Sequence, residues 1–113
     1  MNPDLQSLLA RLPFPGVVAC GGCQCKGGPF QQSYADWLSA PQLTRALNQV
    51  AQATANLKRQ GLEPTRLTWS FEHLRLDIAV RADGSWLALF LQNRADLPVA
   101  AVADLLEQFN AAT

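Results

Sequence analysis

The chain has 113 residues, of which 49% are hydrophobic and only 16% are charged. Nine basic residues balance nine acidic ones, so the formal net charge is zero. This balance argues against a basic nucleic-acid-binding surface and against a long acidic tail. A chain of this length can bury a core of its own, and we expect residues 1–113 to form a single domain. The large apolar fraction favours a subunit interface that hides part of the surface.

The N-terminal segment lacks the basic start and the continuous apolar stretch of a signal peptide. No apolar run approaches the roughly 20 residues of a membrane helix. The chain has three cysteines, an odd number that argues against a closed disulfide framework. Together these features predict a cytoplasmic protein without a membrane span.

The first part of the chain predicts a helix followed by a strand hairpin. A short leucine-rich helix over residues 2–12 ends at a proline pair. Residues 16–25, GVVACGGCQC, indicate a strand that we expect to be weakened or bulged at Gly21-Gly22. Turn residues at 26–28 lead into a return strand over residues 30–37.

A long helix is predicted from the capping box Ser39-Ala40-Pro41-Gln42 to the C-cap glycine Gly61. Its apolar side chains recur at spacings of three and four, which is typical of one buried stripe on an amphipathic helix. The main members of this stripe are Leu43, Leu47, Val50 and Leu57.

Residues 66–91 predict three consecutive antiparallel strands. Leu67, Trp69 and Phe71 alternate with polar residues in the first strand, and residues 74–80 alternate in the second. The third, over residues 85–91, is apolar on both faces, as in a strand covered from both sides. Asp83-Gly84 supplies the positive φ values of a two-residue hairpin turn. A final amphipathic helix covers residues 97–109, with Asp96 as its cap and Pro98 in its first turn.

This element order, α-β-β-α-β-β-β-α, resembles the roadblock family of dynein light chains and small-GTPase regulators, including bacterial ones. The shared features are the leucine helix before Pro15-Gly16-Val17, a first hairpin turning at Gly27-Gly28, the long helix, the apolar last strand and the closing helix. Family members usually carry an acidic residue with glycine in the first hairpin, where this chain has CGGCQCKGG. The resemblance implies an α+β, profilin-like fold: a five-stranded antiparallel sheet between the long helix and two terminal helices.

The resemblance also implies a homodimer that pairs through the long helix and through the following edge strand, residues 65–71. An edge strand with exposed apolar side chains is an aggregation hazard unless it is paired or covered, which supports the same expectation. Arg45, Lys58 and Arg59 are candidate contacts for an acidic partner, although a solvated helix face is the preferred interpretation. The predicted interface residues are Leu43, Leu47, Val50, Leu57, Arg66, Leu67, Trp69 and Phe71.

The candidate metal ligands are Cys20, Cys23 and Cys25, with His73 as a fourth donor for zinc. On a regular strand, however, Cys20 and Cys23 point to opposite faces, so structural thiols are the preferred interpretation. We therefore predict no metal or other cofactor. His73 is expected to pair with Glu72 at a turn, and Asp77 to point outward and pair with Arg75 or Arg81.

No catalytic residues are predicted, because neither a nucleophile motif nor a phosphate-binding loop occurs. Trp37 and Trp86 are interpreted as core residues and Trp69 as an interface residue. The favoured function is a non-enzymatic module that binds or scaffolds a Ras-like GTPase, with at most a regulatory effect on GTP hydrolysis by that partner. The alternatives are a dimeric secretion-type chaperone that binds an effector segment, and a zinc-dependent module. Secretion-type chaperones are usually acidic.

Overall fold

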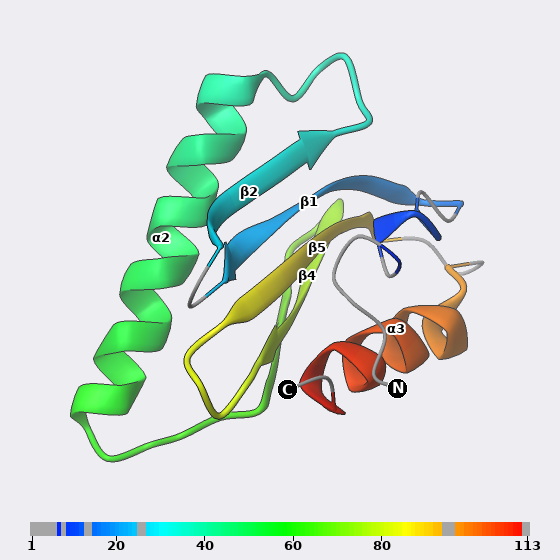
Figure 1. The fold of residues 1–113 in the computed structure, drawn as a ribbon. Coiled ribbons are helices and arrows are strands. Elements are labelled where there is room, and N and C mark those ends of the chain that lie inside the picture. The colour runs from blue at the N-terminus through cyan, green and yellow to red at the C-terminus, as the bar shows by residue number, and fades with distance from the viewer. Residues whose placement is uncertain (1–6, 8, 13–14, 25–26, 94–96, 112–113) are drawn as a thin grey trace.

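A computed structural model of the chain describes residues 7, 9–12, 15–24, 27–93 and 97–111. Its centre is a five-stranded antiparallel sheet in the order β2-β1-β5-β4-β3 (Figure 1). The elements are β1 (Val17–Gln24), β2 (Gly28–Ser33), α2 (Ala40–Arg59), β3 (Arg66–Ser70), β4 (Leu74–Val80), β5 (Trp86–Gln92) and α3 (Val99–Ala111).

The sheet is covered by α2 on one face and by α3 on the other, as Figure 1 shows. This arrangement confirms the predicted α+β fold. The predicted N-terminal helix lies largely outside the described residues, although Ser7 and Leu9 are helical. Leu9 and Leu12 pack against the core on the α3 side. None of the described helices is long and apolar enough to cross a membrane.

β5 lies in the middle of the sheet and supplies both cores. Leu87, Leu89 and Leu91 belong to the cluster on the α3 side. The alternate residues Trp86, Ala88 and Phe90 belong to the cluster on the α2 side. Side chains of a strand point alternately to the two faces, so an uninterrupted apolar run fits a strand that is covered on both sides.

α2 begins and ends where its sequence predicts. The Ser39 hydroxyl accepts a hydrogen bond from the Gln42 N–H at 3.3 Å, and the Gln42 side chain accepts one from the Ser39 N–H at 2.9 Å. This pair is the expected capping box. After the helix, Gly61 has a φ of +83°, the left-handed conformation that commonly ends a helix.

The glycine pair in β1 is not bulged, contrary to the prediction. The pairing of Gly21 and Gly22 with both neighbouring strands is continuous, and the irregularity lies between Val17 and Ala19. The glycines instead permit close packing. A Cβ atom at position 21 would overlap the Leu47 side chain of α2, and one at position 22 would overlap the Trp86 carbonyl oxygen of β5.

The return strand is shorter than predicted, because β2 ends at Ser33 and not near residue 37. The Ser33 hydroxyl lies 3.0 Å from the carbonyl oxygen of Ala35 and 2.8 Å from that of Leu38. These contacts turn the chain away from the sheet. Trp37 therefore sits in a connecting loop with 60% of its surface exposed, so its assignment to the core was wrong.

The hairpin between β4 and β5 has a three-residue loop and not the predicted two-residue turn. The Arg81 N–H donates to Ser85 O at 2.7 Å, and the Gly84 N–H donates to Arg81 O at 3.0 Å. Only Gly84 in this loop has a positive φ, at +93°. This pattern is a turn whose last residue is left-handed, which requires a positive φ at one position instead of two.

Candidate interaction surfaces

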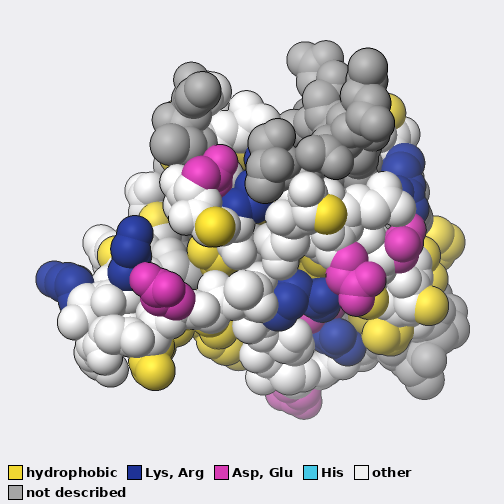
Figure 2. Space-filling model, turned by 60° about the horizontal axis from the view of Figure 1, so that its bottom comes forward, with side chains coloured by type: hydrophobic (Ala, Val, Ile, Leu, Met, Phe, Trp, Pro, Cys, Tyr) yellow, Lys and Arg dark blue, Asp and Glu magenta, His cyan; other side chains and the backbone are white. Residues whose placement is uncertain are grey.

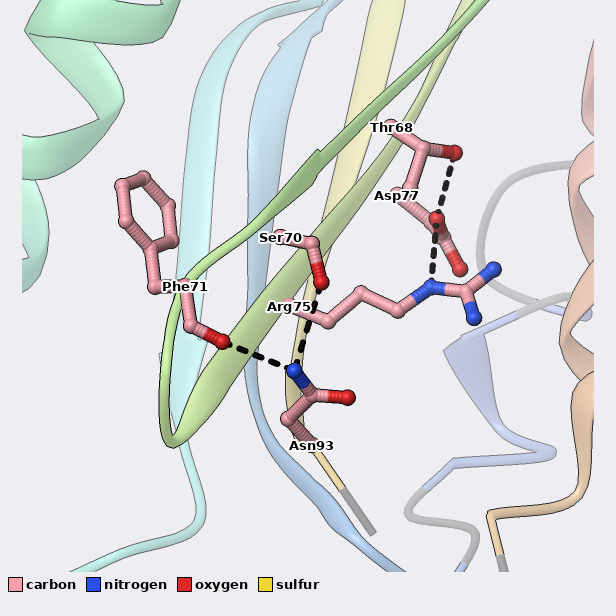
Figure 3. Close-up of polar contacts among 6 residues, drawn as sticks. All are labelled: Thr68, Ser70, Phe71, Arg75, Asp77 and Asn93. Atoms are coloured by element: carbon pink, nitrogen blue, oxygen red, sulfur yellow. Dashed lines mark hydrogen bonds and ion pairs between the residues drawn. The ribbon is translucent and has the colours of Figure 1, made fainter. Parts of the chain in front are cut away.

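Among the described strands, β3 forms one edge of the sheet and pairs with β4 alone. Its outer backbone edge is therefore open to pair with another strand. Leu67 and Trp69 are half-buried and pack against the cluster on the α2 side. Phe71, just beyond the strand, is 57% exposed, and its side chain points to the α2 side of the sheet (Figure 3). The predicted edge strand is thus confirmed, with an apolar border.

The predicted interface residues on α2 divide into two groups. Leu43, Leu47 and Val50 are buried against the sheet, at 0%, 7% and 1% exposure. Their apolar contacts are satisfied within the chain, so the structure places them in its own core. Leu57 is only half-buried, near the end of the helix. α2 packs mainly on β1 and β2, next to which it lies in Figure 1.

A cavity of about 400 Å³ lies between the end of α2 and the β4–β5 hairpin. Its walls are mainly apolar, and the charged residues Lys58, Glu63 and Arg81 also line it. Leu62, which is 54% exposed, stands at its margin. The lining includes Ala55, Lys58, Leu62, Glu63, Val80, Arg81 and Trp86.

The opposite face of β3 and β4 carries a polar network instead of an apolar layer. The Asp77 carboxylate accepts hydrogen bonds from the Thr68 hydroxyl at 2.8 Å and from Arg75 Nε at 3.1 Å (Figure 3). Asp77 is 1% exposed, so it does not point into solvent as predicted, although its predicted pairing with Arg75 is confirmed. The Asn93 side-chain amide donates a hydrogen bond to the Phe71 carbonyl oxygen at 2.7 Å and so holds the end of β3.

Arg66 and Arg81 extend the same polar face toward the end of α3. Arg81 Nε donates to Phe109 O at 2.5 Å, and its guanidinium stacks 4.0 Å above the Phe109 ring. Asn110 donates to Thr65 O at 2.9 Å. These contacts join the last turn of α3 to the start of β3. The sequence shows these arginines only as alternating polar positions, and nothing in it indicates that a helix end would gather them.

Charged side chains of both signs are mixed across the face in Figure 2, where Lys and Arg groups adjoin Asp and Glu groups. On α2, Arg45, Lys58 and Arg59 are exposed, and Arg59 donates to the side chain of Asn56. A solvated helix face accounts for these three residues.

The cysteines do not converge with His73. Cys20 packs in the cluster on the α3 side and Cys23 against the cluster on the α2 side, as the strand alternation predicts. Cys23 of β1 pairs with Trp86 of β5, which in turn pairs with Val80 at the end of β4. His73 comes just before the opposite end of β4. At about 3.3 Å per residue, this register separates Cys23 from His73 by roughly 20 Å. His73 therefore cannot complete a zinc site with Cys23, and Cys25 lies outside the described residues.

The remaining chemistry of these groups is structural. His73 Nε2 lies 3.6 Å from the Glu72 carboxylate, and both side chains are largely exposed, as expected for a turn pair. The Cys20 thiol contacts the Tyr34 hydroxyl at 3.7 Å. Burial raises the pKa of the Cys20 thiol, although the bond to Tyr34 opposes this effect. Burial likewise raises the pKa of Tyr34, and the contact with Cys20 raises it further. Both groups are thus neutral at physiological pH.

At the level of sequence, no family model and no curated protein matches the chain. Among solved structures, it is similar to Myxococcus xanthus MglB, with a TM-score of 0.57 and 12% identity over 84% of this chain and 75% of that one. It is also similar to a Roadblock/LC7 domain from Streptomyces avermitilis, with a TM-score of 0.50 and 15% identity over 94% of this chain and 91% of that one.

The sheet order, the helix on each face and the open β3 edge define an α+β domain of the profilin-like class. Within this class, the chain has the roadblock fold, as the resemblance in its sequence predicts.

Proposed function

We propose that this chain is a non-enzymatic homodimeric module that binds a Ras-like small GTPase or scaffolds its regulation. The fold supports the proposal, because the roadblock family that the sequence resembles contains scaffolds and regulators of such GTPases. The proposal includes a single cytoplasmic domain without a cofactor. Any effect on GTP hydrolysis would arise from contacts that change the switch regions of the partner.

The observation that carries the dimer is the border of β3. Its outer backbone edge pairs with no strand in the described part of the chain, and Trp69 and Phe71 on the α2 side border it. Pairing of this edge with the same edge of a second copy would satisfy both sets of backbone groups and would form one continuous sheet. The half-buried residues Leu57 and Leu67 would then be covered by the second copy. Leu43, Leu47 and Val50 would support this interface from the core.

Light scattering coupled to size-exclusion chromatography tests the dimer. Near tens of micromolar, we expect a mass about twice the 12.3 kDa of one chain. Phe71→Lys places a charge at the border of β3 and is expected to give monomers. Val99→Lys is a matched control, because Val99 is 49% exposed on α3, away from this edge. A monomeric wild type, or equal effects of the two substitutions, would contradict the dimer.

The GTPase partner is tested by capture on the immobilised wild-type protein, with GDP or a non-hydrolysable GTP analogue present. Recovery of a P-loop GTPase that depends on the nucleotide supports the proposal. Recovery of one secreted effector irrespective of nucleotide supports the alternative secretion-type chaperone. The formal net charge of zero counts against that alternative, because such chaperones are typically acidic.

A further inference from the structure

The α3 side of β3 and β4 carries a row of arginines with few acidic partners. Strand alternation and register place Arg66, Arg75 and Arg81 on this face, on the side opposite Leu67 and Trp69. The one buried carboxylate there, that of Asp77, is already bound to Arg75. Among the described residues, Arg66 and Arg81 form no ion pair. The charge of Arg81 also helps to lower the pKa of Asp83, so the described residues here leave one positive charge in excess.

Arg66 makes no hydrogen bond to any described residue, and its Nε is buried without a partner. Its side chain as a whole is half-buried. An arginine that loses hydration without gaining an acceptor destabilises a protein. Such a group is consistent with a site that is completed by an external anion.

Arg81 is held in a fixed orientation beside it. The bond to Phe109 O uses Nε, and the stacking on the Phe109 ring fixes the plane of the guanidinium. The terminal nitrogens make no hydrogen bond to a described residue. A guanidinium that is already oriented loses less conformational entropy when it binds a carboxylate.

Asn110 supplies an acceptor at the same place. Its amide nitrogen donates to Thr65 O at 2.9 Å, next to Arg66. Its Oδ1 is buried and has no donor. The contact between the end of α3 and the start of β3 thus has cationic donors and an unsatisfied acceptor. A ligand that matches it carries both negative charge and N–H groups.

We propose that Arg66, Arg81 and Asn110 form a binding site for an extended acidic segment of a partner protein. Arg66 lies opposite Ala79, so Arg81 is its diagonal neighbour, at roughly 7–8 Å. Alternate residues of an extended chain lie about 6.6 Å apart on one face, so Asp or Glu at every second position matches both arginines. A peptide backbone also supplies N–H donors for Asn110, whereas a phosphodiester offers only acceptors.

The test is an NMR titration of the full chain with a short blocked peptide in which glutamate alternates with threonine. We expect shifts at the Arg66 and Arg81 guanidinium groups and at the Asn110 amide, with affinity that falls as salt is added. Arg66→Gln removes one charge-assisted contact and is expected to weaken binding about tenfold or more. Arg45→Gln, an exposed arginine on α2, is the matched control and is expected to bind as the wild type does.

Three results would overturn the proposal. These are equal affinity for a peptide in which glutamine replaces glutamate, equal loss in the Arg45→Gln control, and stronger binding of inorganic phosphate or single-stranded DNA at the same groups. Circular dichroism checks that each variant is folded. The proposed site needs no second copy of the chain, so light scattering on the same samples separates its failure from failure of the proposed dimer.

Discussion

The glycine pair of the CGGCQC segment provides a test of how the sheet is packed. A Cβ atom added at Gly22 would overlap the Trp86 carbonyl oxygen, and it would lie 3.0 Å from the carbonyl carbon and from the Phe30 ring. Trp86 belongs to the central strand β5, whose backbone is held by neighbours on both sides. The clash in Gly22→Ala therefore cannot be relieved by rotation of one side chain.

The expected cost combines two opposing effects. Overpacking in a well-packed core costs about 1–3 kcal/mol, and a backbone clash favours the upper end of that range. Replacement of glycine by alanine also restricts the unfolded chain, which stabilises by about 0.4–1 kcal/mol. We expect Gly22→Ala to lower the free energy of unfolding by roughly 2 kcal/mol. For a chain of this size, this corresponds to a fall in Tm of about 8 °C.

Gly27→Ala is the matched control in the same hairpin. The three nearest atoms to a Cβ atom added there all belong to the Gln24 side chain, whose far end can move aside. Its stability is expected to stay within about 0.5 kcal/mol of the wild type, or to rise slightly. Urea unfolding followed by tryptophan fluorescence measures both variants. Equal stabilities of the two would refute the close approach of β1 to β5.

Three further substitutions probe local interactions through urea unfolding. Asp77→Ala leaves Arg75 without its carboxylate, and we expect the free energy of unfolding to fall by roughly 2 kcal/mol. This is less than the roughly 3–5 kcal/mol expected when a fully buried pair is broken, because Arg75 keeps 26% of its side chain exposed. An unchanged stability would contradict this network. Ser39→Ala removes the cap of α2 and is expected to cost about 1 kcal/mol, whereas Ser39→Asp should retain most of the wild-type stability. The Ser85 N–H holds the pKa of Asp83 below its ordinary value of 3.8, so this group stabilises the fold above that pH and the effect fades as pH falls through the lower folded value. Asp83→Asn should therefore destabilise at about pH 7 and make little difference near pH 2, and a loss independent of pH would contradict the reasoning.

Much of the fold is predictable from the sequence, because the signals there are local. The capping box fixes the start of α2, and the alternation of residues 74–80 fixes which side of β4 faces α2. The errors arise where the deciding contact is not local. The dipeptide Asp83-Gly84 fits both a two-residue and a three-residue loop, and the strand pairing beyond it selects the longer one. The sequence predicts the return strand as far as residue 37, but the Ser33 side chain bonds to the following backbone and turns the chain.

The interaction surfaces were less predictable for a related reason. An apolar stripe such as Leu43-Leu47-Val50 looks the same whether it packs on its own sheet or on a second copy. Conversely, the alternating Arg66 and Arg81 indicate a solvated strand face until α3 is placed beside them. Periodicity shows which side chains share a face, but it does not show what covers that face.

The two faces of β3 allow this one strand to serve two contacts at once. Phe71 borders the open edge on the α2 side, whereas Arg66 lies on the α3 side, so substitutions at these two residues should act independently. If the β3 edges of two copies pair antiparallel, their arginine rows lie on the same face of the joined sheet, on either side of the symmetry axis. A partner with two acidic segments would then bind both proposed sites together, and its affinity would exceed that of either single contact. Loss of the dimer through Phe71→Lys would remove this gain and leave the binding of a single short peptide unchanged.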